Sequence, residues 1–421
     1  MVDSYRQMAL PDVLELQRGF DLPATARRAG CVPVVASTSV VGRHDTAMVR
    51  GPGVVIGRSG SIGGAQWIET DFWPLNTTLW VKDFRSHDPR WAYYLLKSLN
   101  LSYLNAGSGV PTLNRNHLSN VRVHVPGPVT QRAIAEVLGA LDDKIEANRR
   151  QSAIASELAM TLLRDWFAEY GPVRAKESGG DAYLASDLWD LFPEGFDEHG
   201  RPIGWAEQPF GDLLLDHQGG DWGKDAPSTN YDAAVCIIRG TDLADVVAGD
   251  VGKVPTRYTT GERALRRALR DGDVIVEVSG GSPTQPTGRS LFITESILDR
   301  FPHPVVCASF CRRLRPVNLE NGLLAALHLA SLYAAGGTWG YQNQSTGISN
   351  FQTTRFLSDN RVTWPGEELV HAFAGLVEPL VRLATRNENL ALAALRDALL
   401  PKLLSGKLTV RNVEALGESA Q

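Results

Sequence analysis

The sequence is poor in cysteine and in long apolar runs. Its 421 residues include 4 cysteines, which form no C-x-x-C pair and no cluster with histidine: Cys31, Cys236, Cys307 and Cys311. This spacing argues against a disulfide framework or a zinc site and favours buried, reduced thiols. No apolar run reaches the roughly 18 residues of a membrane span. The first residues also lack the basic-then-apolar layout of a signal peptide, so we expect a cytoplasmic protein without a membrane segment.

Motifs of DNA-modifying and nucleotide-hydrolysing enzymes are missing as well. There is no N-P-P-Y/F loop of the kind that holds a flipped adenine, and no G-x-x-x-x-G-K-[ST] loop for ATP phosphates. Gly57–Ser61 lacks the final glycine of a G-x-S-x-G elbow. Glu277–Ser279 lacks the following lysine that would complete a metal-dependent nuclease set. These absences predict a chain with no catalytic residue, metal or cofactor of its own.

The net charge of −5 is unevenly distributed along the chain. Residues 1–127 carry 13 Lys and Arg against 9 Asp and Glu, whereas residues 128–210 carry 8 against 15. The acidity therefore lies mainly between two less acidic parts, which leaves both of them able to contact phosphate. The low overall basicity predicts that a partner supplies part of the electrostatic affinity for any nucleic acid.

An internal duplication is the clearest feature that is present. Leu10–Gly19 matches Phe210–Gly219, and further matches join Ser108–Leu113 to Thr346–Phe351 and Arg122–Gly127 to Arg361–Gly366. The offset grows from 200 to 239, so the second copy is longer by insertion. We interpret each copy as a lobe of roughly 130–160 residues followed by one long helix.

Both lobes are expected to be rich in β-structure with a few helices. The short β-branched runs Val54–Ile56 and Asp273–Val276 each precede a turn rich in glycine and serine. Trp91–Leu101 and Leu323–Tyr333 are apolar at helical spacing.

A long helix is predicted after each lobe. After Pro128 and after Pro365, apolar or small residues alternate by four and three over about 40 residues, or roughly 60 Å. The predicted seam and subunit-assembly residues are Ile134, Leu138, Leu141, Ile145 and Asn148 in the first helix and Phe373, Leu376, Leu380, Leu383, Asn387 and Leu390 in the second.

Two polar and two proline positions qualify this pattern. Asn148 and Asn387 occupy equivalent seam positions, where they either hydrogen-bond across the interface or face solvent. Pro379 and Pro401 predict a kink or an early end in the second helix.

Two similar lobes on two antiparallel helices would lie at opposite ends of a rod. Such a molecule can contact two separated patches of a long ligand, and duplex DNA presents equivalent major-groove faces about every 34 Å. The predicted fold is therefore α+β: two β-rich lobes with a few helices, joined by two long antiparallel coiled-coil helices in a pseudo-two-fold arrangement.

At Pro126–Glu146 the chain resembles a known family. Its pattern Q-x-x-I-A-x-x-L-x-x-L-D-x-K-I-E is similar to the central conserved helix of type I restriction–modification specificity subunits. The likeness continues through Leu163–Phe167, Gly171–Lys176, Leu191–Trp205 and Leu399–Leu408, and so covers nearly the whole chain. The second helix departs from the family, because it lacks the L-D-x-K-I-E signature.

The resemblance implies a domain organisation and a function. It implies target-recognition domains at residues 1–127 and 206–365, conserved long helices at 128–170 and 366–410, a linker at 171–205 and a tail at 411–421. It implies a non-catalytic specificity subunit that recognises an asymmetric, bipartite site in double-stranded DNA. The helices would dock two modification subunits, which use S-adenosylmethionine to methylate adenine, and restriction subunits could join them.

Two other interpretations remain open. A stand-alone DNA-binding regulator or an anti-restriction mimic could use the same fold without a methyltransferase, and gene neighbourhood would distinguish it. A self-contained nuclease or methylase is opposed by the missing motifs.

Residues that contact DNA are expected on polar or glycine-rich loops, because Arg, Asn, Gln and Ser read base edges. In the first lobe we predict Arg43, His44, Arg58, Ser59, Asn114 and Arg115. In the second lobe we predict Arg257, Tyr258, Gln285, Arg289, Gln342 and Asn343, with Arg263, Arg266, Arg267 and Arg270 contacting phosphates from one helix face. Each of these residues is equally compatible with a solvated surface group or a turn former.

Overall fold

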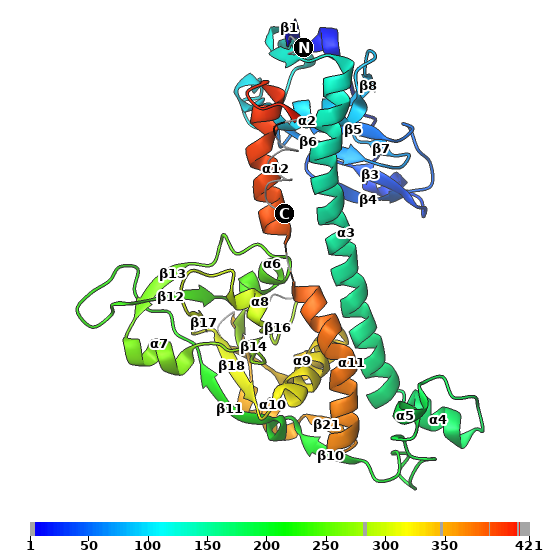
Figure 1. The fold of residues 1–421 in the computed structure, drawn as a ribbon, viewed down its shortest axis with the longest axis vertical. Coiled ribbons are helices and arrows are strands. Elements are labelled where there is room, and N and C mark those ends of the chain that lie inside the picture. Colours follow the sequence, from blue (N-terminus) through cyan, green and yellow to red (C-terminus); the bar gives the residue numbers. More distant parts are fainter. Residues whose placement is uncertain (1–4, 281–283, 346–347, 387, 411, 413–421) are drawn as a thin grey trace. The chain divides into compact units, whose positions relative to one another are not determined.

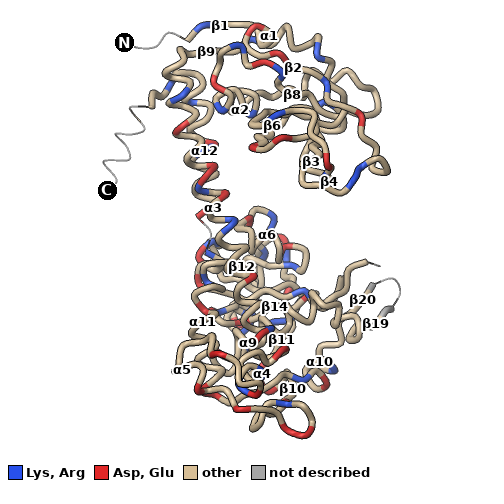
Figure 2. The backbone as a smooth tube through the Cα atoms, turned by 90° about the vertical axis from the view of Figure 1, so that its right-hand side faces the viewer, with Lys and Arg blue, Asp and Glu red and all other residues tan. Residues whose placement is uncertain are grey.

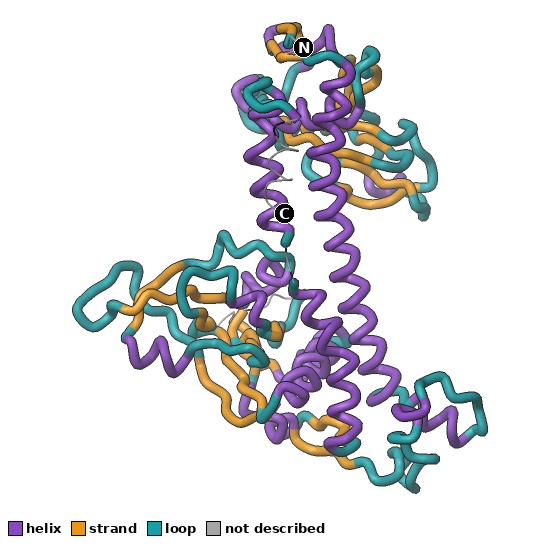
Figure 3. The backbone as a smooth tube through the Cα atoms, in the orientation of Figure 1, coloured by secondary structure: helices purple, strands orange, loops and turns teal. Residues whose placement is uncertain are grey.

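The computed structural model describes residues 5–280, 284–345, 348–386, 388–410 and 412. These residues form two compact units, one made of Met1–Ile145 with Ala391–Gln421 and the other of Glu146–Leu390. Each unit contains one β-rich lobe, and helix α3 (Pro128–Phe167) contributes to both units (Figures 1 and 3). We call the lobe of the first unit lobe 1 and that of the second unit lobe 2.

Lobe 1 consists of two sheets and a two-stranded ribbon. The larger sheet has the order β2-β8-β5-β6 (Glu15–Arg18, Thr78–Asp83, Gly53–Gly57, Gly63–Ile68). The smaller sheet has the order β4-β3-β7 (Val40–His44, Val32–Val35, Trp73–Pro74), and the ribbon pairs β1 (Arg6–Ala9) with β9 (Arg122–Val125). The helices are α1 (Leu10–Val13) and α2 (Pro89–Ser98).

Lobe 2 repeats this plan. Its larger sheet has the order β11-β18-β14-β16 (Leu214–Gly219, Cys311–Pro316, Val274–Glu277, Ser290–Phe292). Its smaller sheet has the order β13-β12-β17 (Thr256–Thr259, Ala233–Ile238, Val305–Cys307), and its ribbon pairs β10 (Ala206–Pro209) with β21 (Arg361–Trp364). A further sheet joins β15, β20 and β19 (Ser279–Gly280, Ile348–Phe351, Gln342–Ser345).

Helices complete the second unit. In the linker they are α4 (Gly171–Glu177) and α5 (Ser186–Trp189), in a segment rich in acidic residues (red in Figure 2). In lobe 2 they are α6 (Leu243–Val247), α7 (Gly261–Arg267), α8 (Glu295–Leu298), α9 (Leu319–Ala334) and α10 (Thr353–Asp359).

The shared strand order shows that the sequence duplication is a structural one. In both lobes the smaller sheet combines one antiparallel and one parallel pair, β3 with β4 and β7, and β12 with β13 and β17. The central strands β5 and β14 are buried along their whole length, which explains their runs of β-branched residues. The predicted α+β fold with two β-rich regions is therefore confirmed.

The structure also refines the register of the repeat. The amide of Gly19 donates to the carbonyl of Thr78 at 3.1 Å, and the amide of Gly220 donates to that of Cys311 at the same distance. Thr78 and Cys311 begin the equivalent strands β8 and β18, so Gly19 corresponds to Gly220 and not to Gly219, as the sequence match indicated. The difference arises because the ladder of β11 shifts near the exposed Leu215.

The long helices take part in the largest apolar core of each unit. In the first unit Ile134 and Leu138 of α3 are buried with α2 and with Leu400, Leu403 and Leu404. In the second unit the other end of α3 is buried with α9 and α11 (Glu367–Thr385), where Trp166 and Phe167 lie 5.7 and 4.8 Å from the ring of Phe373. Within each unit, α3 and the C-terminal helical segment that packs against it run antiparallel.

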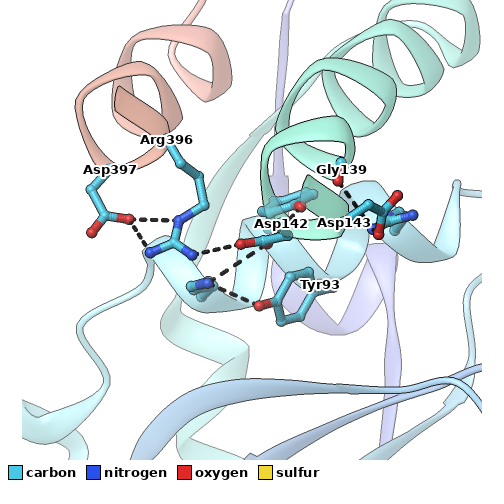
Figure 4. Close-up of polar contacts among 9 residues, drawn as sticks. Tyr93, Gly139, Asp142, Asp143, Arg396 and Asp397 are labelled. Atoms are coloured by element: carbon cyan, nitrogen blue, oxygen red, sulfur yellow. Dashed lines mark hydrogen bonds and ion pairs between the residues drawn. The ribbon is translucent and has the colours of Figure 1, made fainter. Parts of the chain in front are cut away.

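A polar cluster fixes α12 (Asn389–Leu404) to α3 in the first unit (Figure 4). One oxygen of Asp142 accepts a hydrogen bond from Arg396 at 2.5 Å, and the other accepts from the hydroxyl of Tyr94 at 2.8 Å. The neighbouring Asp143 pairs with Arg90 of α2 but is mostly exposed. The aspartate of the L-D-x-K-I-E signature is therefore a structural link between three helices.

This link predicts different costs for two adjacent substitutions. Asp142→Ala should destabilise the protein by about 1–3 kcal/mol, because it leaves the Tyr94 hydroxyl and the mostly buried Arg396 without their shared acceptor. Asp143→Ala, the matched control, should cost under about 1 kcal/mol, since it removes only an exposed ion pair. Denaturant unfolding followed by circular dichroism would measure both; equal losses would contradict this assignment.

The second predicted long helix is in fact two helices, α11 and α12. The predicted early end at Pro379 or Pro401 is wrong, because both prolines lie inside helices. Pro379 has no amide hydrogen, so the carbonyl of Gly375 loses its helical donor. Both residues are exposed, so water can replace that donor, and the proline is tolerated. The break lies instead at Arg386, whose backbone is extended.

Lobe 2 itself supports the end of α11. The carbonyl of Thr385 accepts hydrogen bonds from Arg300 and from the Ser296 hydroxyl, the latter at 3.4 Å, and the Thr385 hydroxyl accepts from Thr294 at 3.1 Å. A cation at the last carbonyls of a helix replaces the donors that the next turn would have supplied. Tertiary contacts therefore end the helix where the local sequence does not.

The predicted seam residues have different environments. Ile134, Leu138, Ile145 and Phe373 are buried, and Leu141 and Leu380 are partly buried. Leu376, Leu383 and Leu390 remain 37–42% exposed, so the buried stripe of α11 lies instead at Leu369, Val370, Phe373, Ala374 and Val377. The amide of Asn148 donates to Asn389 at 3.0 Å. Its predicted partner, Asn387, lies outside the described residues.

Candidate nucleic-acid interface

Lobe 1 has a polar cavity beside its larger sheet. The cavity has a volume of about 570 Å³, and Arg58, Asn114 and Arg115 line it together with Gln17, Arg18 and Asn116. The structure therefore brings together three of the residues predicted to contact DNA. Three guanidinium groups with three amides in one concave site provide donors and acceptors suited to base edges and phosphates.

The backbone holds Arg58 at a fixed place in this cavity. Strand β5 ends at Gly57, where an added Cβ would meet the carbonyl of Ser61 at 2.1 Å, so only glycine fits. The amide of Arg58 donates to the Thr77 carbonyl at 2.8 Å, and its carbonyl accepts from Leu113 at 2.7 Å. Its guanidinium donates to the Asn76 carbonyl at 3.2 Å, which leaves further donors for a ligand.

Other predicted residues of lobe 1 have structural roles. His44 is buried, accepts a hydrogen bond from the Arg28 amide at 3.0 Å and packs edge-on against Trp73, so little of its ring is accessible, and its contact with bases stays a prediction. Arg43 is exposed on the smaller sheet and donates to the Cys31 carbonyl at 2.7 Å, away from the cavity. Asn114 also caps the turn that follows it, by accepting from the Asn116 amide. Ser59 is half-buried directly after Arg58.

Lobe 2 has a surface rich in arginine where α7 meets β11 and β18. Arg263 and Arg266 are exposed on α7, and Arg267 is half-buried against the carbonyl of Gly220. Beneath them the buried Arg313 donates to the Arg266 carbonyl at 2.9 Å and pairs with Asp216. The predicted helix face is shorter than expected, because α7 ends at Arg267 and Arg270 lies beyond it.

A histidine–arginine contact lies on the same pair of strands. Arg312 lies 2.9 Å from the Nδ1 atom of His217. Burial, with a contribution from the charge of Arg312, lowers the pKa of His217 below its usual value. His217 therefore stays neutral near pH 7 and accepts a hydrogen bond from Arg312, so the positive charge of this surface comes from its arginines.

Arg257 and Tyr258 of β13 hold the loop that follows β11. The guanidinium of Arg257 lies 4.5 Å above the ring of Trp222, donates to that residue's carbonyl at 2.7 Å and pairs with Asp225. Tyr258 exchanges two backbone hydrogen bonds with Lys224, of 2.8 and 3.0 Å. These residues are thus largely committed to intramolecular contacts, which leaves Lys224 and the edge of Trp222 exposed.

Two predicted readers of lobe 2 are structural. Arg289 donates two hydrogen bonds, of 2.9 and 2.6 Å, to Glu277, whose side chain is 2% exposed. Gln342 accepts from the Thr287 amide at 2.8 Å and donates to the Ser349 hydroxyl at 3.0 Å. Because both groups already have intramolecular partners, a base would have to compete with these bonds, and the base contacts of Arg289 and Gln342 stay predictions. Gln285 and Asn343 are exposed.

Several residues of both surfaces were not predicted from the sequence. In lobe 1 these are Gln17, Arg18 and Asn116, and in lobe 2 they are Lys224, Arg312 and Arg313. The cluster of three arginines within Cys311–Arg315 was a signal that could have identified Arg312 and Arg313. Among the residues that the structure describes, no group of three or more His, Cys, Asp or Glu could hold a metal ion. Nor does any helix in the described ranges have the length and apolarity of a membrane span.

Comparisons with known proteins agree with this architecture. A family profile described as the type I restriction modification DNA specificity domain matches residues 3–155. A specificity subunit of Methanocaldococcus jannaschii, that of the type I restriction enzyme MjaIX, is 24% identical over 345 residues, which cover 76% of this chain and 69% of the relative. Residues 3–155 belong to the DNA specificity domains of type I restriction–modification systems.

Two further comparisons concern a second relative and a solved structure. The specificity subunit of the Haemophilus influenzae type I enzyme HindI is 33% identical over 66 residues, which cover 16% of this chain and 14% of the relative. The crystal structure of a type I S subunit from M. genitalium is 16% identical, has a TM-score of 0.60 and covers 96% of both chains, which shows the shared fold. As a member of this family, the specificity subunit selects DNA and is itself non-catalytic.

The placement of Arg58 predicts a selective defect in a DNA specificity subunit. Arg58→Ala should weaken binding to the cognate site by about 5- to 150-fold, since one well-placed base contact contributes about 1–3 kcal/mol of discrimination. Competition binding with cognate and scrambled duplexes at fixed salt would measure this loss. Arg43→Ala, which lies outside the cavity, is the control and should keep cognate selectivity. An unchanged preference in the Arg58 variant would contradict the assignment.

Proposed function

We propose that the specificity subunit recognises an asymmetric, bipartite site in double-stranded DNA, with one half-site read by each lobe. The observation that carries the proposal is that both lobes share one strand order but differ in the residues at equivalent surfaces. A common frame with different side chains would place two different base-reading surfaces on one molecule. The predicted domain boundaries, at residues 1–127 and 206–365, remain part of this proposal.

The long helices would dock the other subunits. Several large apolar side chains remain 37–64% exposed on α3, α11 and α12 of the isolated chain: Ile154, Leu158, Leu376, Leu383, Leu390 and Leu395. Rows of exposed apolar residues on long helices are typical of surfaces that bind another protein. We propose that two modification subunits bind here, that restriction subunits can join them, and that the assembly works in the cytoplasm.

The chemistry would then belong to the partners. The modification subunits would bind S-adenosylmethionine and methylate adenine, while this chain contributes the choice of site. An exposed basic surface in each lobe would hold the DNA backbone, with further affinity from the partners.

A lobe exchange in a reconstituted complex would test the proposed function. Co-expression with the modification subunit, followed by methylome sequencing, should give a two-part motif. Replacing lobe 2 with the corresponding lobe of the M. jannaschii relative should change one half of that motif and leave the other half intact. A motif that stays the same after the exchange would contradict the proposal. Gel filtration would show whether a loss of methylation arises only because the subunits fail to assemble.

A further inference from the structure

The two lobes share one backbone turn, which we call a corner. Corresponding backbone hydrogen bonds identify it in each lobe. In lobe 1 the amides of Arg58 and Ser59 donate to the Thr77 carbonyl at 2.8 and 3.0 Å. In lobe 2 the amides of Val278 and Ser279 donate to the Phe310 carbonyl at 2.8 and 3.1 Å. We call these sets the Arg58 corner and the Val278 corner.

A third hydrogen bond confirms the equivalence. Leu113 donates to the Arg58 carbonyl, and Phe351 donates to the Val278 carbonyl, both at 2.7 Å. Each corner follows the buried central strand of its larger sheet, β5 or β14. The backbone of both corners is therefore held from two sides, and their side chains project from a fixed frame.

The side chains at these equivalent positions differ in chemistry. The first corner presents the guanidinium of Arg58 to the polar cavity, beside the half-buried Thr77. The second corner has the apolar Val278 in place of the arginine and Phe310 in place of the threonine. Phe310 is 60% exposed, and its ring contacts no other aromatic ring within the described part of the chain.

We propose that the Val278 corner is a specificity determinant that recognises an apolar base edge, the 5-methyl group of a thymine, through Phe310. The inference rests on the proposed function, in which the equivalent Arg58 corner meets a base edge. A guanidinium pairs with the acceptors of guanine, whereas a phenylalanine ring can only offer apolar contact, and in the major groove that contact is the thymine methyl.

The surroundings of Phe310 fit this role. Ser279, at the same corner, lies within hydrogen-bond distance of Asn350 on the neighbouring strand, so polar groups flank the exposed ring. The basic surface of α7 and β18 belongs to the same lobe, and β18 begins directly after Phe310. An apolar ring on a fixed backbone, in a lobe with polar and basic groups, would contribute binding free energy when it is buried against a methyl group.

Single-methyl substitution in DNA tests the proposal directly. The complete complex with its modification subunits would be titrated with duplexes carrying the motif found by methylome sequencing. Each thymine of the lobe 2 half-site would be replaced in turn by deoxyuridine, which lacks only the methyl group. We expect one replacement to weaken wild-type binding about fourfold, the value of one buried methyl group. The Phe310→Ala complex should bind the thymine and deoxyuridine duplexes equally.

Matched controls separate this contact from general damage. Phe310→Leu keeps an apolar side chain and should retain part of the discrimination. Val317→Ala removes another exposed apolar residue, 55% exposed and just beyond the other end of β18, and should keep all of it. Deoxyuridine replacements in the lobe 1 half-site should change the binding affinity of the Phe310→Ala complex and of the wild-type complex to the same extent.

Two results would overturn the proposal. One is a wild-type complex that tolerates deoxyuridine at every position of the half-site; the other is a Phe310→Ala complex that still prefers thymine. Neither result would disturb the proposed function, whose own failure would be a methylation motif that does not depend on the identity of lobe 2.

Discussion

Replacing Leu138 by aspartate should unfold the first unit and abolish assembly with the modification subunits. Leu138 of α3 is fully buried, in the same core as Leu400 and Leu403 near the end of α12. A carboxylate there would be buried without a partner, at a cost of about 3–5 kcal/mol, which is a large part of the stability of a domain. Thermal unfolding, limited proteolysis of α12 and gel filtration with the modification subunit would measure the effect.

The matched control for this substitution is Val129→Asp. Val129 is 72% exposed in the first turn of the same helix, where a negative charge is favourable. We expect wild-type stability and assembly. Normal assembly of the Leu138 variant would contradict the packing of α3 against α12.

Arg289→Ala should destabilise lobe 2 by about 3–5 kcal/mol instead of producing a selective defect in DNA binding. The carboxylate of Glu277 is 2% exposed and accepts two hydrogen bonds from Arg289, so the substitution leaves a buried charge unpaired. Native-state hydrogen exchange in β14 and β16, compared between variant and wild type, would report the loss.

Arg263→Ala provides the contrast. Arg263 is exposed on α7, and the variant should fold normally and lose affinity for all duplexes alike, with a shallower salt dependence. If Arg289→Ala were as stable as Arg263→Ala and lost only cognate binding, Arg289 would be a base reader after all.

The repeated plan could be predicted because local sequence determines it. Buried β-branched runs form β5 and β14, and Asp88 and Asn318 cap the helices α2 and α9 that cover the sheets. The long helix α3 begins at Pro128, in agreement with its apolar spacing. These features depend on residues close together in the chain.

Features that depend on distant residues could not be predicted. The end of α11 is set by Arg300 and Thr294, about 90 positions before Thr385, while both prolines in the pattern are accommodated. The shift of one residue in β11 likewise depends on how that strand pairs with β18. The spacing of residues along the sequence does not indicate such contacts.

Candidate DNA contacts were the least predictable feature for the same reason. Arg58 directly follows the buried strand β5 and Arg289 directly precedes β16, each next to a glycine, yet Arg58 lines an open cavity and Arg289 pairs with Glu277. The difference is a buried carboxylate at the position equivalent to Gly57, which the sequence alone does not place beside Arg289. Only the fold separates exposed arginines from those that stabilise the lobe.

The most direct test of the central claim is a chain that carries lobe 1 twice. The ribbons define equivalent ends, Arg6 with Val125 and Ala206 with Trp364, so residues 6–125 can replace residues 206–364. If each lobe reads one half-site, methylome sequencing of the resulting complex should show the lobe 1 half-site twice and no trace of the lobe 2 half-site. Retention of the original asymmetric motif would contradict the account.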